Sequence, residues 1–399
     1  MNQVIKKRIE DINNGIVPEG YKQTPFGIFP CDWEADKKLK DLGTFDKGKG
    51  LPGDKMCEYG VPCIGYGDIY MKYNYHFEKA QNFVDEETAN ESQPIEKGTL
   101  LFTGTGETAE EIGKCVCYNG DETIYAGGDI ILFNSKDVSP LFLAYQQYQD
   151  FSLKKKATYG QGHSVVHIQR GELGKLYTAF PQDKTEQGKI AEILMKWDEM
   201  VEFQEQYIQK LELRKKAIMK KLLTPQDGWK NRKLGDVCKI KTGRLDANAM
   251  VENGEYPFFT CSKEIFSIDK YSFDCEALLM AGNGDIGDIK YYNGKFDAYQ
   301  RTYVLSDFSF NIKYVMYYLL FNFDKDVMKG MQKSSMPYIK LELLQKADIY
   351  YNEGAIDKTV EVLEKVDEEI SLQKEKLEKI KIQRKAMQQY LLTGIVRVR

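Results

Sequence analysis

The sequence is poor in the residue types and patterns that whole classes of function require. It has only three histidines, and its eight cysteines include no CxxC pair. We therefore expect neither a zinc site nor a disulfide framework, and we interpret the cysteines as reduced thiols of a cytoplasmic protein. No apolar run reaches the roughly 18–20 residues of a membrane span. The polar start, Met1 to Glu10, has no apolar core of a secretory signal.

Neither sign of charge dominates the chain. Its 56 Lys and Arg against 60 Asp and Glu give a net charge of −4. Nucleic-acid-binding proteins are more often basic, so the total argues weakly against that class. It does not exclude the class, because binding depends on a local basic surface rather than on the total. The 399 residues are enough for two or three domains.

What the sequence does contain is an internal repeat. Residues 190–224 match residues 359–393 at one offset without a gap (367 − 198 = 169), and about a dozen positions are identical. Solenoid repeats have periods of roughly 20–50 residues, so this repeat is of another kind. We predict two copies of a large module, each a globular part followed by a long helix. Such a protein is suited to reading something that also has two halves.

The repeated stretches carry a coiled-coil pattern. Their apolar positions alternate in steps of four and three over more than four heptads, which predicts a pair of helices roughly 50 Å long. Both seams also hold a glutamine and a long cation at matching places, and such polar residues fix register. In an antiparallel pair the two glutamines would face each other. The alternative is two amphipathic helices packed separately on their own domains. The predicted seam consists of Leu194, Trp197, Gln204, Ile208 and Leu211 with Leu363, Val366, Gln373, Leu377 and Ile380.

The globular segments that precede the two helices share three phrases. Both begin with a tryptophan, Trp33 or Trp229, and both continue to an apolar strand that runs into glycines. Both then contain Tyr-Asn-Gly, a hairpin signal. We expect an α+β protein with two mixed α/β domains that are versions of one fold. The predicted segments are an arm at 1–29, a domain at 30–181, a helix at 182–225, a domain at 226–350 and a helix at 351–399.

Short motifs that suggest cofactor or metal chemistry lack the context they need. The glycines of 282–287 fit GxGxxG, but strand and turn residues follow where a dinucleotide fold needs a helix. His163 and His167 are four apart, yet flanking glycines favour a loop over a metal-binding helix. The Asn/Asp-Pro-Pro-aromatic motif of amino-methyltransferases is absent. We therefore predict no catalytic residue, no metal site and no cofactor in this chain.

The ordered double set of phrases resembles the specificity (S) subunits of type I DNA restriction-modification systems over nearly the whole length. The second helix departs from the family pattern at its start, where Asn352-Glu353-Gly354-Ala355 replaces a proline and Glu-Gln phrase. The resemblance is carried by Trp33 and Leu39, Ser164 and Ile168, Pro181, Glu186-Gln187, Ile190, Leu194, Asp198, Leu211, Lys216, Leu222-Leu223-Thr224, Trp229 and Leu234, Ser334 to Ile339, and Leu391-Leu392-Thr393-Gly394.

The resemblance implies a non-catalytic protein that selects DNA for its partners. Each domain would read one half of a bipartite double-stranded target through the major groove, with the helices as a ruler between half-sites about 34 Å apart. Two modification (methyltransferase) subunits would dock on it, bind S-adenosylmethionine and methylate adenine N6. Two restriction (motor-nuclease) subunits would bring ATP, Mg and cleavage. No membrane is involved.

Candidate DNA-binding residues follow from the chemistry of groove readout. Base edges are read by Arg, Lys, Asn, Gln, Ser, Thr or Asp on loops, and phosphates by cations and small polar groups. Tyr66, Tyr299 and Tyr338 are expected in the core instead. The candidates are Lys47, Lys49, Thr103, Thr105, Lys154, Lys155, Lys156, Gln161, His163, Ser164 and Arg170 in the first domain, and Lys241, Arg244, Ser262, Lys263, Asn283, Gln300, Arg301, Lys333, Ser334, Ser335 and Lys340 in the second.

Three other functions remain open at this point. A recognition subunit of a single-complex restriction system that cuts on both sides of its site would have nearly the same sequence. A coiled-coil scaffold whose domains bind proteins belongs to a different class. A nuclease or methyltransferase in its own right is disfavoured by the missing motifs.

Overall fold

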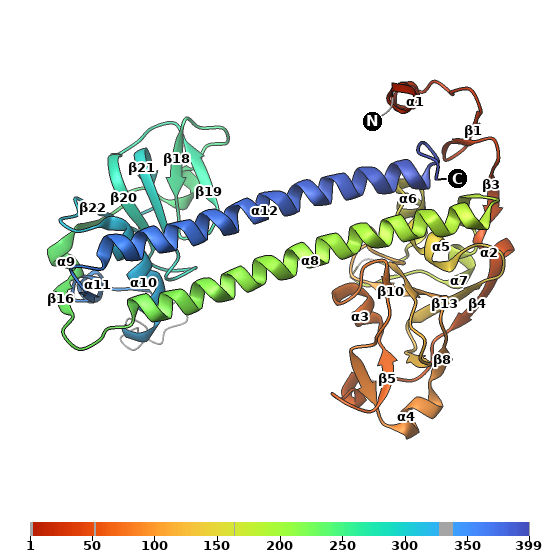
Figure 1. The fold of residues 1–399 in the computed structure, drawn as a ribbon, viewed down its shortest axis with the longest axis horizontal. Coiled ribbons are helices and arrows are strands. Elements are labelled where there is room, and N and C mark those ends of the chain that lie inside the picture. Colours follow the sequence, from red (N-terminus) through yellow and green to blue (C-terminus); the bar gives the residue numbers. More distant parts are fainter. Residues whose placement is uncertain (1–2, 52, 163, 327–337, 399) are drawn as a thin grey trace. The chain divides into compact units, whose positions relative to one another are not determined.

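Two long helices, α8 (Lys184–Leu223) and α12 (Ile356–Leu392), run through the protein. In the computed structural model, which describes residues 3–51, 53–162, 164–326 and 338–398, the chain divides into two units. Unit 1 holds Met1–Glu202 with Glu378–Arg399, and unit 2 holds Phe203–Leu377. Each unit therefore combines one globular domain with a segment of each long helix (Figure 1).

Matching signals end the two helices, while their starts differ. Thr224 Oγ1 donates to the Lys220 carbonyl and Thr393 Oγ1 donates to the Gln389 carbonyl, so the repeated Leu-Leu-Thr makes the same terminal hydrogen bond twice. At the start of α8, the Asp183 carboxylate accepts from the Thr185 amide at 2.8 Å, as a capping residue does. Before α12, Asn352 accepts from the Gly354 amide instead.

The paired helices are antiparallel within unit 2, and their glutamines meet. Gln204 Nε2 donates to Gln373 Oε1 at 2.9 Å, and Tyr207 OH donates to Glu369 Oε1 at 3.0 Å, so the partner number falls as the chain ascends α8. Gln204 is 4% exposed. The prediction that the two glutamines face each other is therefore confirmed.

The predicted seam residues lie mostly in the interior. Trp197, Val366 and Gln373 are half-buried, whereas the other predicted seam positions are buried. In unit 1, Leu194 of α8 shares one apolar cluster with Leu391 and Leu392 of α12. In unit 2, Leu223 of α8 shares another with Leu363 of α12. The fold expected from the sequence, two mixed domains with two long helices packed together, is confirmed.

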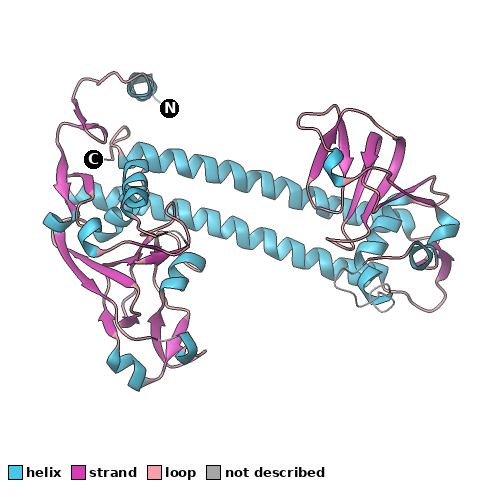
Figure 2. Ribbon diagram, turned by 180° about the vertical axis from the view of Figure 1, so that it is seen from behind, coloured by secondary structure: helices cyan, strands magenta, loops and turns pink. Residues whose placement is uncertain are grey.

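Domain 1 contains a five-stranded sheet, a four-stranded sheet and the two-stranded pairs β10-β14 and β15-β3, with short helices beside them (Figure 2). The larger has the order β4-β13-β9-β11-β6 and the smaller β7-β5-β12-β8. Its elements are β3 (Trp33–Lys38), α2 (Leu39–Leu42), β4 (Gly43–Lys47), η1 (Gly53–Lys55), β5 (Val61–Ile64), α3 (Tyr66–Met71), β6 (His76–Phe77), β7 (Asn82–Val84), α4 (Glu86–Glu91), β8 (Gln93–Ile95), β9 (Thr99–Thr103), β10 (Thr105–Gly106), β11 (Cys115–Tyr118), β12 (Ile124–Ala126), β13 (Ile130–Ser135), α5 (Pro140–Gln146), α6 (Asp150–Tyr159), β14 (Val166–His167), α7 (Arg170–Leu173) and β15 (Tyr177–Pro181).

Domain 2 is built around one sheet of order β17-β22-β20-β21-β18-β19. A separate antiparallel pair, β16 with β23, lies next to the long helices in sequence. The elements are β16 (Lys230–Lys233), α9 (Leu234–Val237), β17 (Lys239–Thr242), η2 (Ala247–Ala249), β18 (Tyr256–Phe259), β19 (Ile265–Ile268), β20 (Phe273–Ala281), β21 (Ile289–Ala298), β22 (Thr302–Ser306), α10 (Ile312–Asp326), α11 (Leu341–Gln345) and β23 (Asp348–Tyr351).

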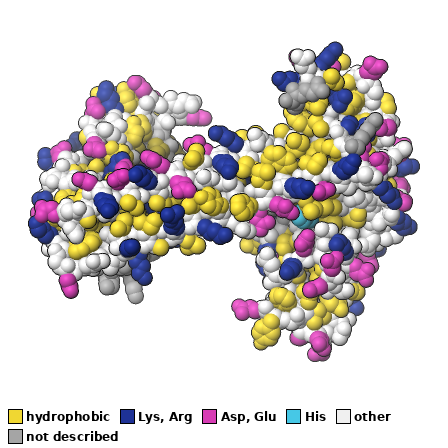
Figure 3. All heavy atoms as spheres, in the orientation of Figure 1, with side chains coloured by type: hydrophobic (Ala, Val, Ile, Leu, Met, Phe, Trp, Pro, Cys, Tyr) yellow, Lys and Arg dark blue, Asp and Glu magenta, His cyan; other side chains and the backbone are white. Residues whose placement is uncertain are grey.

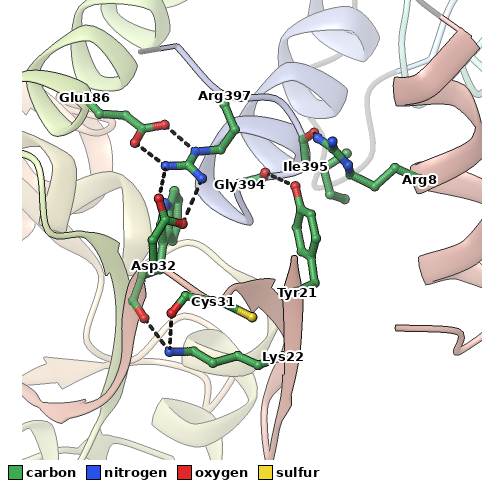
Figure 4. Close-up of polar contacts among 10 residues, drawn as sticks. Arg8, Tyr21, Lys22, Cys31, Asp32, Glu186, Gly394, Ile395 and Arg397 are labelled. Carbon is green, nitrogen blue, oxygen red and sulfur yellow. Dashed lines mark hydrogen bonds and ion pairs between the residues drawn. The ribbon is translucent and has the colours of Figure 1, made fainter. Parts of the chain in front are cut away.

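The N-terminal arm holds the C-terminal end of the chain. It consists of α1 (Gln3–Asn13) and the hairpin β1 (Tyr21–Thr24) with β2 (Gly27–Pro30). Tyr21 OH donates to the Gly394 carbonyl at 2.6 Å, and Arg8 Nη1 donates to the Ile395 carbonyl at 2.6 Å (Figure 4). Gly394 has a φ of +69°, and a Cβ there would lie 2.5 Å from Pro30, so only glycine fits this crossing.

An ion pair closes the same region. Arg397 donates from Nε and Nη2 to the Glu186 carboxylate at 2.6 and 2.7 Å, and from Nη1 to Asp32 at 2.9 Å (Figure 4). Glu186 is 1% exposed, so this buried carboxylate depends on the arginine for its charge partner. The segment that follows α12 is thereby fixed to the first turn of α8 and to the residue that precedes β3.

We predict that Gln204 and Gln373 are energetically coupled. Gln373→Leu leaves the buried Gln204 amide without this partner, and Gln204→Leu leaves the half-buried Gln373 amide without it, at a cost of about 1–3 kcal/mol where the amide is buried. Changing both glutamines removes both amides, so that neither lacks a hydrogen-bond partner. The double variant should therefore be more stable than either single variant, with a coupling energy of about 1 kcal/mol or more. Denaturant unfolding of the full-length chain measures all four states. Gln209→Leu, at an exposed position of α8, controls for helix propensity; additivity within about 0.5 kcal/mol would contradict the prediction.

Candidate nucleic-acid interface

In unit 2, most predicted contact residues meet in one set of loops at the ends of the central strands. The Gln300 amide donates to the Leu245 carbonyl at 2.9 Å, and the Gly282 amide donates to the Arg301 carbonyl at 3.0 Å. The Asp285 amide donates to the Cys261 carbonyl at 3.2 Å. These bonds join the loops that carry Arg244, Ser262, Lys263, Asn283, Gln300 and Arg301.

The side chains of this set are accessible. Arg244, Lys263, Gln300 and Arg301 are exposed, and Ser262 and Asn283 are half-buried. Lys340 is also exposed and adjoins the set, because the amide of its neighbour Ile339 donates to the Gly282 carbonyl at 2.9 Å. Lys241 is exposed on β17. Lys333, Ser334 and Ser335 lie outside the described residues.

The loops approach one another closely because glycines form the crossings. A Cβ at Gly243 would lie 1.8 Å from the Ala298 carbonyl oxygen, and one at Gly282 would lie 2.5 Å from the Arg301 carbonyl oxygen. Gly284 has a φ of +65° against Cys261. The GxGxxG-like string therefore serves loop packing here, since no helix follows it.

Unit 1 repeats this arrangement with different residues. The Gly104 amide donates to the Asp129 carbonyl and accepts, through its own carbonyl, from the Ile168 amide at 3.0 Å. β10 pairs with β14, which places Thr105 opposite His167. The bonds Gly104–Ile168 and Gly282–Ile339 occupy equivalent places in the two domains. The two domains thus present one loop framework with different side chains.

Predicted contact residues of unit 1 divide into accessible and buried ones. Thr105 is half-buried, and His163 lies outside the described residues. Two predictions are not supported: Thr103 is fully buried, and Lys156 is 1% exposed. Neither side chain is available to DNA. The accessible candidates are Lys47, Lys49, Lys154, Lys155, Gln161, Ser164 and Arg170.

Lys156 is buried because its helix turns it toward the domain core. Its Nζ donates to the Gly113 carbonyl at 2.8 Å and lies 5.7 Å from the centre of the Tyr148 ring. Burial lowers the pKa of Lys156 to about 8. Its neighbours Lys154 and Lys155 are exposed, so only one lysine of the triplet points inward.

The sequence did not predict several of the residues that are exposed at these loops. His167 was considered only as a metal ligand, yet it is exposed and its Nδ1 lies 3.1 Å from Thr105 Oγ1. Tyr66 and Tyr338 were expected in the core, but both are 43% exposed. The neighbouring glycines at 65 and 67 were the available signal for Tyr66, since they favour a turn.

The described part of the chain offers little else that binds or reacts. Within the ranges that the structure describes, no three His, Cys, Asp or Glu side chains are grouped to hold a metal ion. In the same ranges no helix is long and apolar enough to cross a membrane. What remains is a pair of exposed polar loop sets on two versions of one domain, each attached to a pair of long helices. This architecture defines a protein of two related mixed-sheet domains combined with paired long helices.

Comparison with known proteins gives the family. The family model of the type I restriction modification DNA specificity domain matches residues 30–213 and 226–382. The match covers both domains and most of both long helices, and the chain belongs to this family. It is a DNA specificity subunit of a type I restriction-modification system, and the family is non-catalytic. The predictions of the family and of a non-enzyme are therefore confirmed.

Individual relatives agree with this assignment. A segment is 44% identical over 112 residues to the type I restriction enzyme EcoDI specificity subunit of Escherichia coli, covering 28% of this chain and 25% of that protein. The putative type I restriction enzyme MjaX specificity subunit of Methanocaldococcus jannaschii is 25% identical, over 96% of this chain and 97% of that protein. The crystal structure of an S subunit from M. genitalium has the same fold, with a TM-score of 0.63 at 16% identity over 94% of this chain and 99% of that one.

The buried lysine generates a pH prediction. Its folded pKa of about 8 lies below the ordinary value of 10.5, so between these pH values the unfolded chain binds more protons. Stability must then rise with pH, by about 1 kcal/mol per pH unit from pH 8 to pH 10. Lys156→Met should lack this rise, whereas Lys155→Met at the exposed neighbour should keep it. Denaturant unfolding at several pH values measures the difference between each variant and the parent, which cancels other titrating groups. Equal slopes in all three proteins would contradict the burial of a charged amine.

Proposed function

We propose that each domain reads one half of a bipartite DNA sequence through the major groove, with its exposed loop set as the reading surface. The observation that carries this proposal is the repetition of one loop framework with different side chains. The bonds Gly104–Ile168 and Gly282–Ile339 keep the frame, while the exposed candidates differ: Gln161 and Arg170 in one domain, Gln300 and Arg301 in the other. A backbone frame that is repeated in both domains, with different donor side chains, suits two different base sequences.

The chemistry of the loops fits base reading better than uniform phosphate binding. Gln300 Nε2 donates to Asp246 at 2.6 Å, so an amide and a carboxylate stand beside the exposed Arg244 and Arg301. Arginine pairs with guanine and amides pair with adenine in the major groove, whereas carboxylates accept from cytosine. The outlying Lys241, Lys263 and Lys340 suit phosphates.

The exposed apolar residues of the long helices suit docking of the two methyltransferase subunits. Phe203 and Leu213 on α8 are 71% and 65% exposed, and Leu372 and Ile382 on α12 are 61% and 69% exposed. At the 169-residue offset of the repeat, Phe203 matches Leu372 (203 + 169 = 372) and Leu213 matches Ile382 (213 + 169 = 382). Hydrophobic side chains are visible along the helices in Figure 3. Repeated apolar positions in water suit two copies of one partner, which would bring S-adenosylmethionine, while two restriction subunits would bring ATP and Mg.

Mapping of N6-methyladenine tests the proposed function. Cells that carry this gene with its neighbouring genes should show methylation in a split motif with two defined half-sequences and a fixed gap. Deletion of this gene alone should remove it. Expressed complex without any such motif would contradict the proposal and favour a scaffold that binds proteins.

Arg301→Ala should relax the base preference of one half-site only. Loss of a bidentate arginine contact to a base costs about 1–3 kcal/mol of discrimination, so methylation should spread to sites with other bases at about one position. The same mapping measures it. Arg232→Ala, in β16 of the same domain, is the control, because the Arg232 guanidinium donates within its own segment to the Asp236 carbonyl. Relaxation at both half-sites, or at neither, would sink the assignment of Arg301 to one half-site.

A further inference from the structure

Each unit contains the same three-residue polar cluster at the place where its domain meets the long helices. In unit 1 the cluster consists of Asp198, Tyr145 and Arg384, and we call it clamp 1. Asp198 of α8 accepts from Tyr145 OH at 2.5 Å and from Arg384 Nε of α12 at 2.7 Å. In unit 2 the cluster consists of Asp367, Tyr317 and Lys215, and we call it clamp 2. Asp367 of α12 accepts from Tyr317 OH at 2.8 Å and pairs with Lys215 Nζ of α8 at 2.5 Å. Each clamp thus joins a domain helix, α5 or α10, to both long helices through one carboxylate.

The clamps follow the internal repeat. Asp198 and Asp367 are 169 residues apart, and so are Lys215 and Arg384 (384 − 215 = 169). These two cations are the long cations at matching seam positions. Each tyrosine comes from a domain whose remaining sequence has diverged, yet each donates its hydroxyl to the aspartate at the equivalent position of the repeat. Two unlike domains therefore use the same joint.

A second polar contact is also repeated in both units. Gln146 Nε2 on α5 donates to the Leu392 carbonyl at 2.8 Å, and Asn322 Nδ2 on α10 donates to the Leu223 carbonyl at 3.2 Å. Leu223 and Leu392 are equivalent in the repeat (392 − 223 = 169). Each domain helix is thus joined to a carboxylate of one long helix and to the final carbonyl of the other. Further polar contacts support both helices, among them Ser139 N to Gln187 Oε1 in unit 1 and Asn311 Nδ2 to Asp357 Oδ1 in unit 2.

Two directional contacts can fix an orientation that apolar packing alone leaves free. The apolar clusters between domain and helices supply attraction that is not directional, whereas hydrogen bonds weaken steeply when distance or angle changes. The surroundings strengthen the joint in unit 1, where the Arg384 guanidinium lies 4.0 Å from the centre of the Tyr75 ring. Burial and the adjacent carboxylate raise the pKa of both Tyr145 and Tyr317, so both hydroxyls stay protonated and remain donors.

We propose that Tyr145 and Tyr317 are positioning residues that set the accepted gap between half-sites by holding each recognition domain in one orientation on the long helices. This inference rests on the proposed function. Adding or removing one base pair in the gap moves a half-site by about 3.4 Å along the DNA and turns it by about 35°. A domain held by all of its directional contacts rejects that displacement. A domain that has lost the hydroxyl contact to the carboxylate accepts part of it.

The test compares tyrosine variants that remove only the hydroxyl. Tyr145→Phe and Tyr317→Phe keep the Asp–cation pair and the aromatic ring. Matched controls come from the same helical regions: Tyr148 OH donates to the Cys115 carbonyl and Tyr314 OH donates to the Tyr350 carbonyl, both inside their own domains. Tyr148→Phe and Tyr314→Phe therefore remove a hydroxyl that is bonded within its own domain and leave the hydrogen bonds to Asp198 and Asp367 in place.

The readout is the distribution of gap lengths among N6-methyladenine sites in cells that express each variant with its partner subunits. In Tyr145→Phe or Tyr317→Phe, sites with a gap one base pair longer or shorter should reach about a tenth of the methylation at parent-gap sites, since about 1.4 kcal/mol corresponds to a factor of ten. The bases of both half-sites should stay unchanged. Both control variants and Lys215→Arg, which gives clamp 2 the cation type of clamp 1, should keep the single gap.

Two results would overturn the inference while leaving the proposed function intact. One is a single, unchanged gap in both tyrosine variants. The other is loss of methylation at every gap length in those variants with the controls unaffected, because the hydroxyls would then maintain the fold rather than the orientation. A parent that yields no split motif at all would instead contradict the proposed function itself.

Discussion

Burial of the apolar stripe of each long helix is the constraint on which the rest of this structure depends. A helix of 40 residues, such as α8, has no means of covering its own apolar side chains. In unit 1, Ile190 and Leu194 of α8 share one cluster with Leu391 of α12 and with Phe142 and Trp33 of domain 1. The domain core and the helix seam are therefore one continuous interior. Neither the domain nor the helices can shift without exposing the other.

Polar groups within this interior fix the register of the helices, which apolar packing alone does not determine. Gln204 meets Gln373 in the seam, and Asp198 and Asp367 each meet a cation and a tyrosine. These groups contribute little net stability compared with apolar packing, because desolvation offsets most of their attraction. They do penalise every other register, since a shift by one residue would leave buried donors and charges without partners. Arg397 with Glu186 acts in the same way at the chain ends.

The sequence predicted the features that depend on local periodicity and on self-similarity. The offset of 169 residues identified the helix pair, and the seam glutamines were matched correctly because antiparallel pairing follows from repeat symmetry. The orientation of Lys156 could not be predicted in the same way. It lies in the run Lys154-Lys155-Lys156, and only the packing of α6 against Gly113, a residue 43 positions earlier, decides which lysine turns inward. Thr103 belongs to a strand buried throughout, which its threonine character did not reveal.

The two clamps could not be predicted from the sequence, for a related reason. The seam cations Lys215 and Arg384 were visible as exceptions to an apolar pattern, but their partners are not local. Asp198 lies 186 positions from Arg384, and Tyr145 lies 53 positions from Asp198 in a domain of different sequence. A repeat offset can pair equivalent positions with each other, but it cannot pair a helix with a diverged domain. Only the fold brings the tyrosine hydroxyl to the carboxylate.

The distribution of repeated and unrepeated features separates two tasks in this chain. Helix ends, seam glutamines, clamp aspartates and loop-crossing glycines recur in both halves, whereas the side chains on the loops do not. Features that must position a domain obey geometric requirements that any target shares, so both halves meet them alike. Side chains that must match a base sequence have no common requirement. Gly104 and Gly282 can therefore hold the same backbone crossing while Thr105 follows one and Asn283 the other. If the loops read bases as we propose, a new specificity requires changes on the loops alone, provided that the tyrosine, the amide and the crossing glycines still hold the new loops at the same place on the helices.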